Sequence, residues 1–364
     1  MKGVFHMSNV HSQSLDFFMG ALSPKGGFRG YFSHLNQQPD LWLYLIKAGP
    51  GCGKSTLMAK LAEKSPLPVE RIHCSSDPDS LDGVVFPHKQ AAILDATAPH
   101  VVEPDYPGAK QTVVNLFDTL SEATLYENRQ QIRTLFDTCS ALQKKANRCI
   151  RCASLLLEEM HNLVRPALDN QKLLGYVQRL GHRLLPPTDG TPVEHLRLLS
   201  AVTPKGELCW KNTVSAIANH VVVFEDCHGV AARMAMEQLR QQALHAGYEI
   251  YTCICPLSPE ESPEHILIPA LHLAFVTSNH WHPMEFTGQQ TIHCTRFFEK
   301  EQVSRHKNQL RLCQTAVDEL LAQTSLYQRQ AKENHDKLEV FYRSAANFEA
   351  VNAITQQVEK KIGL

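Results

Sequence analysis

The fold of this chain is decided by the stretch Leu43-Tyr44-Leu45-Ile46-Lys47-Ala48-Gly49-Pro50-Gly51-Cys52-Gly53-Lys54-Ser55-Thr56. Its apolar beginning predicts a buried strand, and its glycines predict a turn. Leu57, Met58 and Leu61 then recur at helical spacing. A strand, a glycine-rich loop, a Lys-Ser pair and a helix in this order are typical of a phosphate-binding loop.

Each part of such a loop has a chemical role. Gly51 and Gly53 allow backbone N–H groups to approach a phosphate, and the helix N-terminus adds partial positive charge. Lys54 would reach the β- and γ-phosphate oxygens, and the Ser55 hydroxyl would bind Mg²⁺. Ala48 stands where the strict pattern has its first glycine. The predicted nucleotide-binding residues are Gly49, Pro50, Gly51, Cys52, Gly53, Lys54, Ser55 and Thr56.

Carboxylates downstream of the loop complete the predicted site. Asp95 ends the apolar run Ala91–Leu94, and as a strand end it would hold a water on Mg²⁺ beside the loop. Ala96 follows, so a water-activating carboxylate next to Asp95 is missing and rapid hydrolysis by that route is not expected. The metal ligands are therefore predicted to be Ser55 and Asp95.

The segment 74–83 contains three carboxylates on what we expect to be a turn-rich loop near the same sheet edge. Asp77 or Asp79 could position a nucleophile or bind metal, and an Asx-turn that caps a short helix explains them equally well. His100 could contact phosphate or act as an acid or base, although a structural role is at least as plausible. The catalytic candidates are Lys54, Asp95, Asp77 and Asp79.

Composition limits the class of protein. The chain has 364 residues, 43% hydrophobic content and a net charge of −1, which gives no electrostatic case for binding nucleic acid or an anionic membrane. No apolar run approaches a membrane span, and residues 1–10 lack the apolar core of a signal peptide. Eleven cysteines without framework spacing suit a reducing compartment, so we expect a cytoplasmic protein.

The cysteines suggest two further hypotheses. Cys52, at the helix N-terminus, is expected to have a lowered pKa and to be open to oxidation. Zinc is not favoured at Cys149-x-x-Cys152, because Cys149 lies on a helical seam, nor at Cys253-x-Cys255, because alternate strand residues face opposite sides.

An internal repeat organises the chain. Residues 21–26 and 201–206 are similar at an offset of 180, and an apolar run at 220–224 corresponds to the strand before the loop. Two heptad-patterned stretches follow, from Ile132 to Leu163 and from Leu310 to Phe341, with the same register at an offset of 178. Helices of about 32 residues would be about 48 Å long, so they must project from the core or lie across its width.

These patterns predict two tandem P-loop NTPase-like α/β domains with parallel-type sheets, each followed by a long heptad-patterned helical hairpin. The first would cover residues 11–185, with its helical arm at about 109–185. The second would cover 193–364, with its arm at about 298–364. The two seams could pack on each other about a pseudo-two-fold axis near Ala146 and Thr324.

The second copy has lost the residues that bind nucleotide. Ala231, Ala232 and Arg233 stand where Gly53, Lys54 and Ser55 stand, and Thr277 replaces Asp95. No metal-binding hydroxyl and no carboxylate remain there, so we expect a degenerate, non-hydrolysing half.

With these motifs in view, the chain resembles a family of bacterial P-loop ATPase-like proteins built from two tandem nucleotide-loop repeats, which has no assigned substrate. The resemblance covers nearly the whole length and rests on four stretches, residues 17–28, 47–56, 73–84 and 95–100. Family members often keep a phosphate loop in both halves, and this chain does not. The resemblance implies binding of ATP or GTP with Mg²⁺.

The resulting functional hypothesis is Mg²⁺-dependent NTP binding by the first domain, with slow hydrolysis coupled to movement of the helical arms. One alternative is a small-molecule kinase, of the nucleoside or nucleotide type, in which Asp77 or Asp79 orients an acceptor hydroxyl. Another is a non-hydrolysing switch or scaffold whose arms bind a protein partner. Nothing in the sequence distinguishes ATP from GTP.

Overall fold

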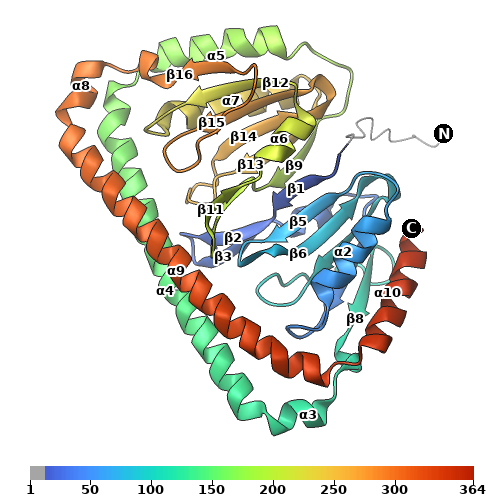
Figure 1. The fold of residues 1–364 in the computed structure, drawn as a ribbon. Coiled ribbons are helices and arrows are strands. Elements are labelled where there is room, and N and C mark those ends of the chain that lie inside the picture. The colour runs from blue at the N-terminus through green and yellow to red at the C-terminus, as the bar shows by residue number, and fades with distance from the viewer. Residues whose placement is uncertain (1–12) are drawn as a thin grey trace.

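The computed structural model describes residues 13–364, and within them two six-stranded sheets and two long helices form one body (Figure 1). The N-terminal residues 1–10, for which no signal peptide is expected, and the predicted domain boundary at residue 11 lie outside the described residues. None of the helices in residues 13–364 has the length and apolar character needed to cross a membrane.

The first sheet has the strand order β1-β5-β6-β7-β4-β8. Its strands are β1 (Leu15–Phe18), β4 (Trp42–Lys47), β5 (Glu70–Cys74), β6 (Asp77–Phe86), β7 (Ala91–Asp95) and β8 (Gln111–Asn115). Between them lie the hairpin β2 (Gly20–Ser23) and β3 (Gly27–Gly30), and the helices α1 (Ser33–Gln37) and α2 (Lys54–Lys64).

The strand and helix predicted around the glycine-rich loop are confirmed. Strand β4 lies between its parallel neighbours β7 and β8, and its Leu43, Leu45 and Ile46 side chains are fully buried. Helix α2 buries Leu57, Met58 and Leu61, the positions that the helical spacing indicated.

The second sheet repeats this arrangement, with the order β9-β13-β14-β15-β12-β16. Its strands are β9 (Val193–Arg197), β12 (His220–Glu225), β13 (Glu249–Ile254), β14 (Pro263–Ile268), β15 (Leu273–Ser278) and β16 (Gln290–His293). The hairpin β10 (Ser200–Thr203) and β11 (Gly206–Cys209) and the helices α6 (Lys211–Ile217) and α7 (Val230–His245) occupy the same places in the order. We call residues 15–184 the first half and 193–362 the second half.

The expectation of parallel-type sheets is wrong in part, because both sheets are mixed. Strand β6 runs antiparallel to β5 and β7, and β14 runs antiparallel to β13 and β15. The residues expected to form a turn-rich loop, from Asp77 to Gly83, are the first part of β6, with register shifts beside His73. Polar side chains concealed this strand, because three aspartates and a proline are rare in strands.

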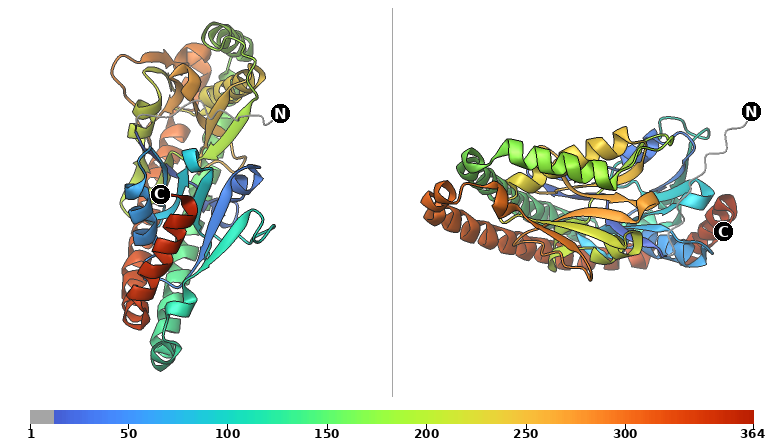
Figure 2. Two further views of the ribbon diagram at one scale, coloured as in Figure 1. Left: turned by 90° about the vertical axis from the view of Figure 1, so that its right-hand side faces the viewer. Right: turned by 90° about the horizontal axis from the view of Figure 1, so that it is seen from above.

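The two long helices cross as an antiparallel pair along one side of both sheets (Figures 1 and 2). They are α4 (Arg129–Val164) and α9 (Lys307–Ala345), which follow the short helices α3 (Glu122–Glu127) and α8 (Lys300–Arg305). Ala146 and Thr324 are both fully buried, and the Cys139 thiol donates to the Ala331 carbonyl at 3.4 Å. The predicted packing of the two seams is therefore confirmed, and the helices lie across the whole body.

The expected helical hairpins are not formed. Helix α5 (Asn170–Leu184) turns away from α4 and packs on α7 of the second half, and α10 (Phe348–Ile362) packs near α2 of the first half (Figure 1). The last helix of each half therefore packs on the other half. The heptad pattern specified an apolar face on each helix but not the partner that covers it. The domain boundaries at 185 and 193 stay a prediction.

The two halves meet in a common core. Phe18 and Leu198 form an antiparallel bridge with N···O distances of 2.9 and 2.8 Å, and their neighbours on β1 and β9 are buried together. Inside this core, the Arg197 guanidinium donates to Glu70 at 2.8 Å, and the Tyr251 hydroxyl donates to the same carboxylate at 2.7 Å.

Candidate functional site

The glycine-rich loop, residues 48–53, connects β4 to α2. Gly51 (φ +64°) and Gly53 (φ +83°) both adopt left-handed backbone conformations that L side chains avoid. Gly53 is the N-cap residue of α2 and no side chain caps the helix. In the described part of the chain, no acceptor is recorded for the backbone N–H groups of Gly51, Gly53 and Lys54. The loop therefore presents donors at a helix N-terminus, where an anion binds favourably.

Lys54 and Asp95 are brought together, as the sequence predicted for one site. The Lys54 ammonium lies 3.2 Å from Asp95 Oδ2 and donates to the Gly49 carbonyl at 3.2 Å. Asp95 is at the end of β7, which is the parallel neighbour of β4, and its Oδ1 accepts from Thr97 N at 2.9 Å. The Ser55 hydroxyl oxygen accepts from Leu81 N at 2.9 Å. A cation, a hydroxyl and a carboxylate thus lie at the carboxyl edge of the sheet.

Asp77 and Asp79 are held by other partners. Asp77 accepts from the Ser80 hydroxyl at 2.8 Å and lies 3.4 Å from the Lys332 ammonium on α9. Asp79 is largely exposed and forms an ion pair with Lys205 of the second half at 2.6 Å, which lowers its pKa. The structure therefore gives neither carboxylate a contact with the loop.

The expectation for Cys52 is wrong. Its thiol is fully buried and donates to the Pro50 carbonyl at 3.5 Å. Burial raises the pKa of the Cys52 thiol, and the nearby Lys54 charge only partly offsets this. The Cys52 side chain is 0% exposed, so it lacks the exposure that a redox-sensitive thiolate needs.

In the second half, the side chain of Asp226 binds backbone N–H groups of the segment equivalent to the glycine-rich loop. Asp226 Oδ2 accepts from Ala232 N at 2.9 Å, and Asp226 Oδ1 accepts from His228 N at 3.0 Å. Gly229 (φ +77°) is the N-cap residue of α7, as Gly53 is of α2. A buried internal carboxylate therefore occupies the N-terminus of α7, where an anionic ligand would otherwise bind. The sequence predicted the loss of Lys54 and Ser55 equivalents but not this replacement.

Helix α9 of the second half packs directly on the glycine-rich loop. A Cβ atom on Gly49 would lie 2.6 Å from the Tyr342 ring, and one on Gly51 would lie 2.9 Å from the Glu339 carbonyl oxygen. Helix α4 of the first half likewise packs on the equivalent loop of the second half, where a Cβ atom on Gly229 would lie 3.0 Å from His161 Nε2. Because these glycines have no side chains, the long helices can pack closely on the two loops. This packing is a role separate from any contact with phosphate.

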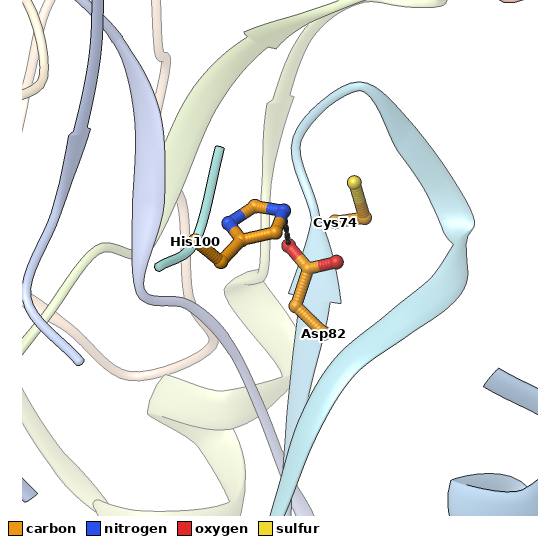
Figure 3. A group of neighbouring side chains, drawn as sticks. All are labelled: Cys74, Asp82 and His100. Carbon is orange, nitrogen blue, oxygen red and sulfur yellow. Dashed lines mark ion pairs between the residues drawn. The ribbon is translucent and has the colours of Figure 1, made fainter. Parts of the chain in front are cut away.

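The residues that sequence reasoning undervalued are Asp82 and its neighbours. Cys74, Asp82 and His100 place a thiol, a carboxylate and an imidazole within 4.8 Å of one another (Figure 3). Asp82 is 4% exposed, and burial raises its pKa to about 6. The signal in the sequence was that Asp82 and His100 recur as Glu264 and His282 at a common offset.

Comparisons of this chain with protein-family models, curated proteins and solved structures gave no match. What the site can do is therefore argued from its geometry.

Proposed function

We propose that the chain binds a magnesium–nucleoside triphosphate, ATP or GTP, at the glycine-rich loop and the first turn of α2. The observation that carries the proposal is the contrast between the two helix N-termini. The N–H groups of Gly51, Gly53 and Lys54 have no recorded acceptor in the described residues and the Lys54 side chain lies beside Asp95, whereas at α7 the Asp226 carboxylate already accepts from Ala232 N. A triphosphate supplies the negative charge that the first site lacks.

The side chains have distinct roles in this proposal. Lys54 exchanges Asp95 for the β- and γ-phosphate oxygens when nucleotide binds. The Ser55 hydroxyl and the Asp95 carboxylate are oxygen ligands of the kind that Mg²⁺ prefers, and Mg²⁺ supplies charge neutralisation on the phosphates. The Thr97 N–H bond to Asp95 Oδ1 orients this carboxylate.

We also propose slow hydrolysis in a cytoplasmic protein, coupled to the arms. Ala96 follows Asp95, so no adjacent carboxylate activates water. The loop contacts Glu339 and Tyr342 of α9, so a change in loop conformation on phosphate binding would be felt by the arm, where a protein partner could bind.

This contact between the loop and α9 favours a nucleotide-dependent switch as the second candidate function. The kinase alternative has less support, because Asp77 and Asp79 already form ion pairs with Lys332 and Lys205.

The test is binding of fluorescent ATP and GTP analogues with and without Mg²⁺, combined with phosphate release. Lys54→Ala is expected to weaken binding at least about 10-fold, about 1.4 kcal/mol. Lys60→Ala, an exposed lysine on the same helix, is the matched control. Unchanged affinity in Lys54→Ala would overturn the proposal. Turnover without an acceptor supports hydrolysis, turnover only with added nucleosides supports the kinase, and tight binding without turnover supports the switch.

A further inference from the structure

The cluster of Cys74, Asp82 and His100 combines three potential metal ligands from three segments of the first half. Cys74 ends β5, Asp82 lies on the neighbouring β6, and His100 follows β7. His100 Nε2 lies 3.3 Å from Asp82 Oδ2 (Figure 3). Two ligand atoms bound to one ion at about 2.0 Å with a tetrahedral angle are separated by about 3.3 Å, so this pair already has suitable spacing.

The polar atoms of this cluster are incompletely satisfied. Asp82 Oδ2 and His100 Nδ1 are buried without a recorded hydrogen-bond partner. The rings of Phe28 and Phe32 pack against the His100 imidazole, with centroids 4.6 and 5.3 Å away, and exclude water from it. A carboxylate buried in this way costs free energy unless hydrogen bonds or a cation compensate its charge.

The second half contains an equivalent cluster, in which Glu264, His265 and His282 also bring ligand atoms within 4.8 Å of one another. By strand register, Glu264 and His282 correspond to Asp82 and His100, and Cys255 corresponds to Cys74. His265 stands where the first half has Gly83.

Glu264 is therefore surrounded by protein partners. Its carboxylate lies 3.5 Å from the imidazole of His265 and 3.4 Å from that of His282, and it accepts from the Ser200 hydroxyl at 3.1 Å. Glu264 thus has a hydroxyl donor in addition to its imidazole contacts, whereas Asp82 Oδ2 has no recorded hydrogen-bond partner among the described residues.

The chemistry of the donors selects the cation. A thiolate, an imidazole and a carboxylate are ligands of Zn²⁺ and related transition metals, whereas Mg²⁺ and Ca²⁺ prefer oxygen donors alone. One thiolate and one carboxylate neutralise a divalent ion. Three protein donors leave a fourth position for water.

We propose that Cys74, Asp82 and His100 bind one Zn²⁺ ion, and that the second half binds none. Binding displaces the Cys74 proton to solvent as the thiolate forms.

The experiment uses the full chain without nucleotide or Mg²⁺, and measures Zn²⁺ affinity by chelator competition and thiolate ligation by the absorption of the Co²⁺ complex. One equivalent of Zn²⁺ and a thiolate-to-Co²⁺ charge-transfer band are expected. Cys74→Ser is expected to remove the band and to weaken Zn²⁺ binding more than about 100-fold, and His100→Asn to weaken it similarly. Circular dichroism verifies that each variant is folded.

Cys255→Ser, at the equivalent position, and Lys54→Ala, in the nucleotide loop, are the controls and are expected to keep both signals. Absence of stoichiometric binding by the wild-type chain would overturn the proposal. So would a thiolate band that survives in Cys74→Ser or is lost in Cys255→Ser. Retention of Zn²⁺ in Lys54→Ala together with loss of nucleotide would separate this site from the proposed function.

Discussion

Asp226 and His265 are two charged or titratable residues that the second half has and the first half lacks at the equivalent positions. Asp226 provides an anion at the N-terminus of α7, and His265 provides an imidazole beside Glu264. The corresponding places in the first half are Ala48 and Gly83, which carry no charge. At the residue scale, the second half therefore supplies with its own side chains what the first half is proposed to take from a nucleotide and a metal ion.

Replacement of Asp226 tests its role as an internal anion. Asp226→Ala removes a buried acceptor from two backbone N–H groups and is expected to lower the free energy of unfolding by about 1–2 kcal/mol. Urea denaturation measures the loss, with Asp40→Ala as an exposed control. A change in nucleotide affinity of the first half, or no loss of stability, would argue against this role.

At the scale of the elements, the long helices α9 and α4 pack on the loops that contain Gly49 and Gly229. Gly49→Ala is expected to destabilise the chain by about 1–3 kcal/mol, because the new methyl group overlaps the Tyr342 ring. In a Tyr342→Ala background the same change should cost less, since the ring is gone. A double-mutant cycle from denaturant unfolding gives the coupling energy, expected at about 0.5–3 kcal/mol. Zero coupling would show that α9 does not rest on the loop.

The packing of α4 on the loop of the second half is expected to depend on pH, because His161 lies at this contact. Burial lowers the pKa of His161 from 6.5 to about 4, and the charges of Arg233 and His228 add to this effect. Between these values the unfolded state binds a proton that the native state does not, so stability is retained above pH 6.5 and lost as pH falls toward 4.

The loss attributable to His161 is at most about 3 kcal/mol. His161→Gln should flatten the dependence of unfolding free energy on pH across this window. An identical slope in wild type and His161→Gln would contradict the assignment.

The sequence predicted the elements better than their partners. Leu43, Leu45 and Met58 gave the strand and helix that hold the loop, because burial imposes a period on apolar residues. The seam around Ala146 was predicted for the same reason. Helices α5 and α10 each pack on the opposite half. No local sequence pattern encodes this choice, because the apolar face of a helix can be buried against either half.

The site was predictable where its chemistry is local and not where it depends on register. Lys54 and Asp95 follow from a loop and a strand end, and the structure brings them together. Asp82 was one of several carboxylates in a polar segment, and its burial results from the register of β6 between β5 and β7. Asp77 and Asp79 precede it on the same strand and are bound by lysines from distant segments.

At the scale of the whole molecule, the halves are joined by β1, β9 and the exchanged helices. The buried pair of Arg197 and Glu70 lies in this joint, 1% and 4% exposed. Arg197→Met leaves the Glu70 charge without its main partner and is expected to cost about 3–5 kcal/mol. Calorimetry should show a single transition at lower temperature. Two separate transitions in the wild-type chain would contradict a common core.

The central claim is that only the first half leaves a helix N-terminus open for a triphosphate. Titration of the chain with a fluorescent ATP analogue in the presence of Mg²⁺ tests it most directly. The account predicts one equivalent bound per chain, lost in Lys54→Ala and retained in Arg233→Ala. Two equivalents, or one equivalent that survives Lys54→Ala, would contradict it.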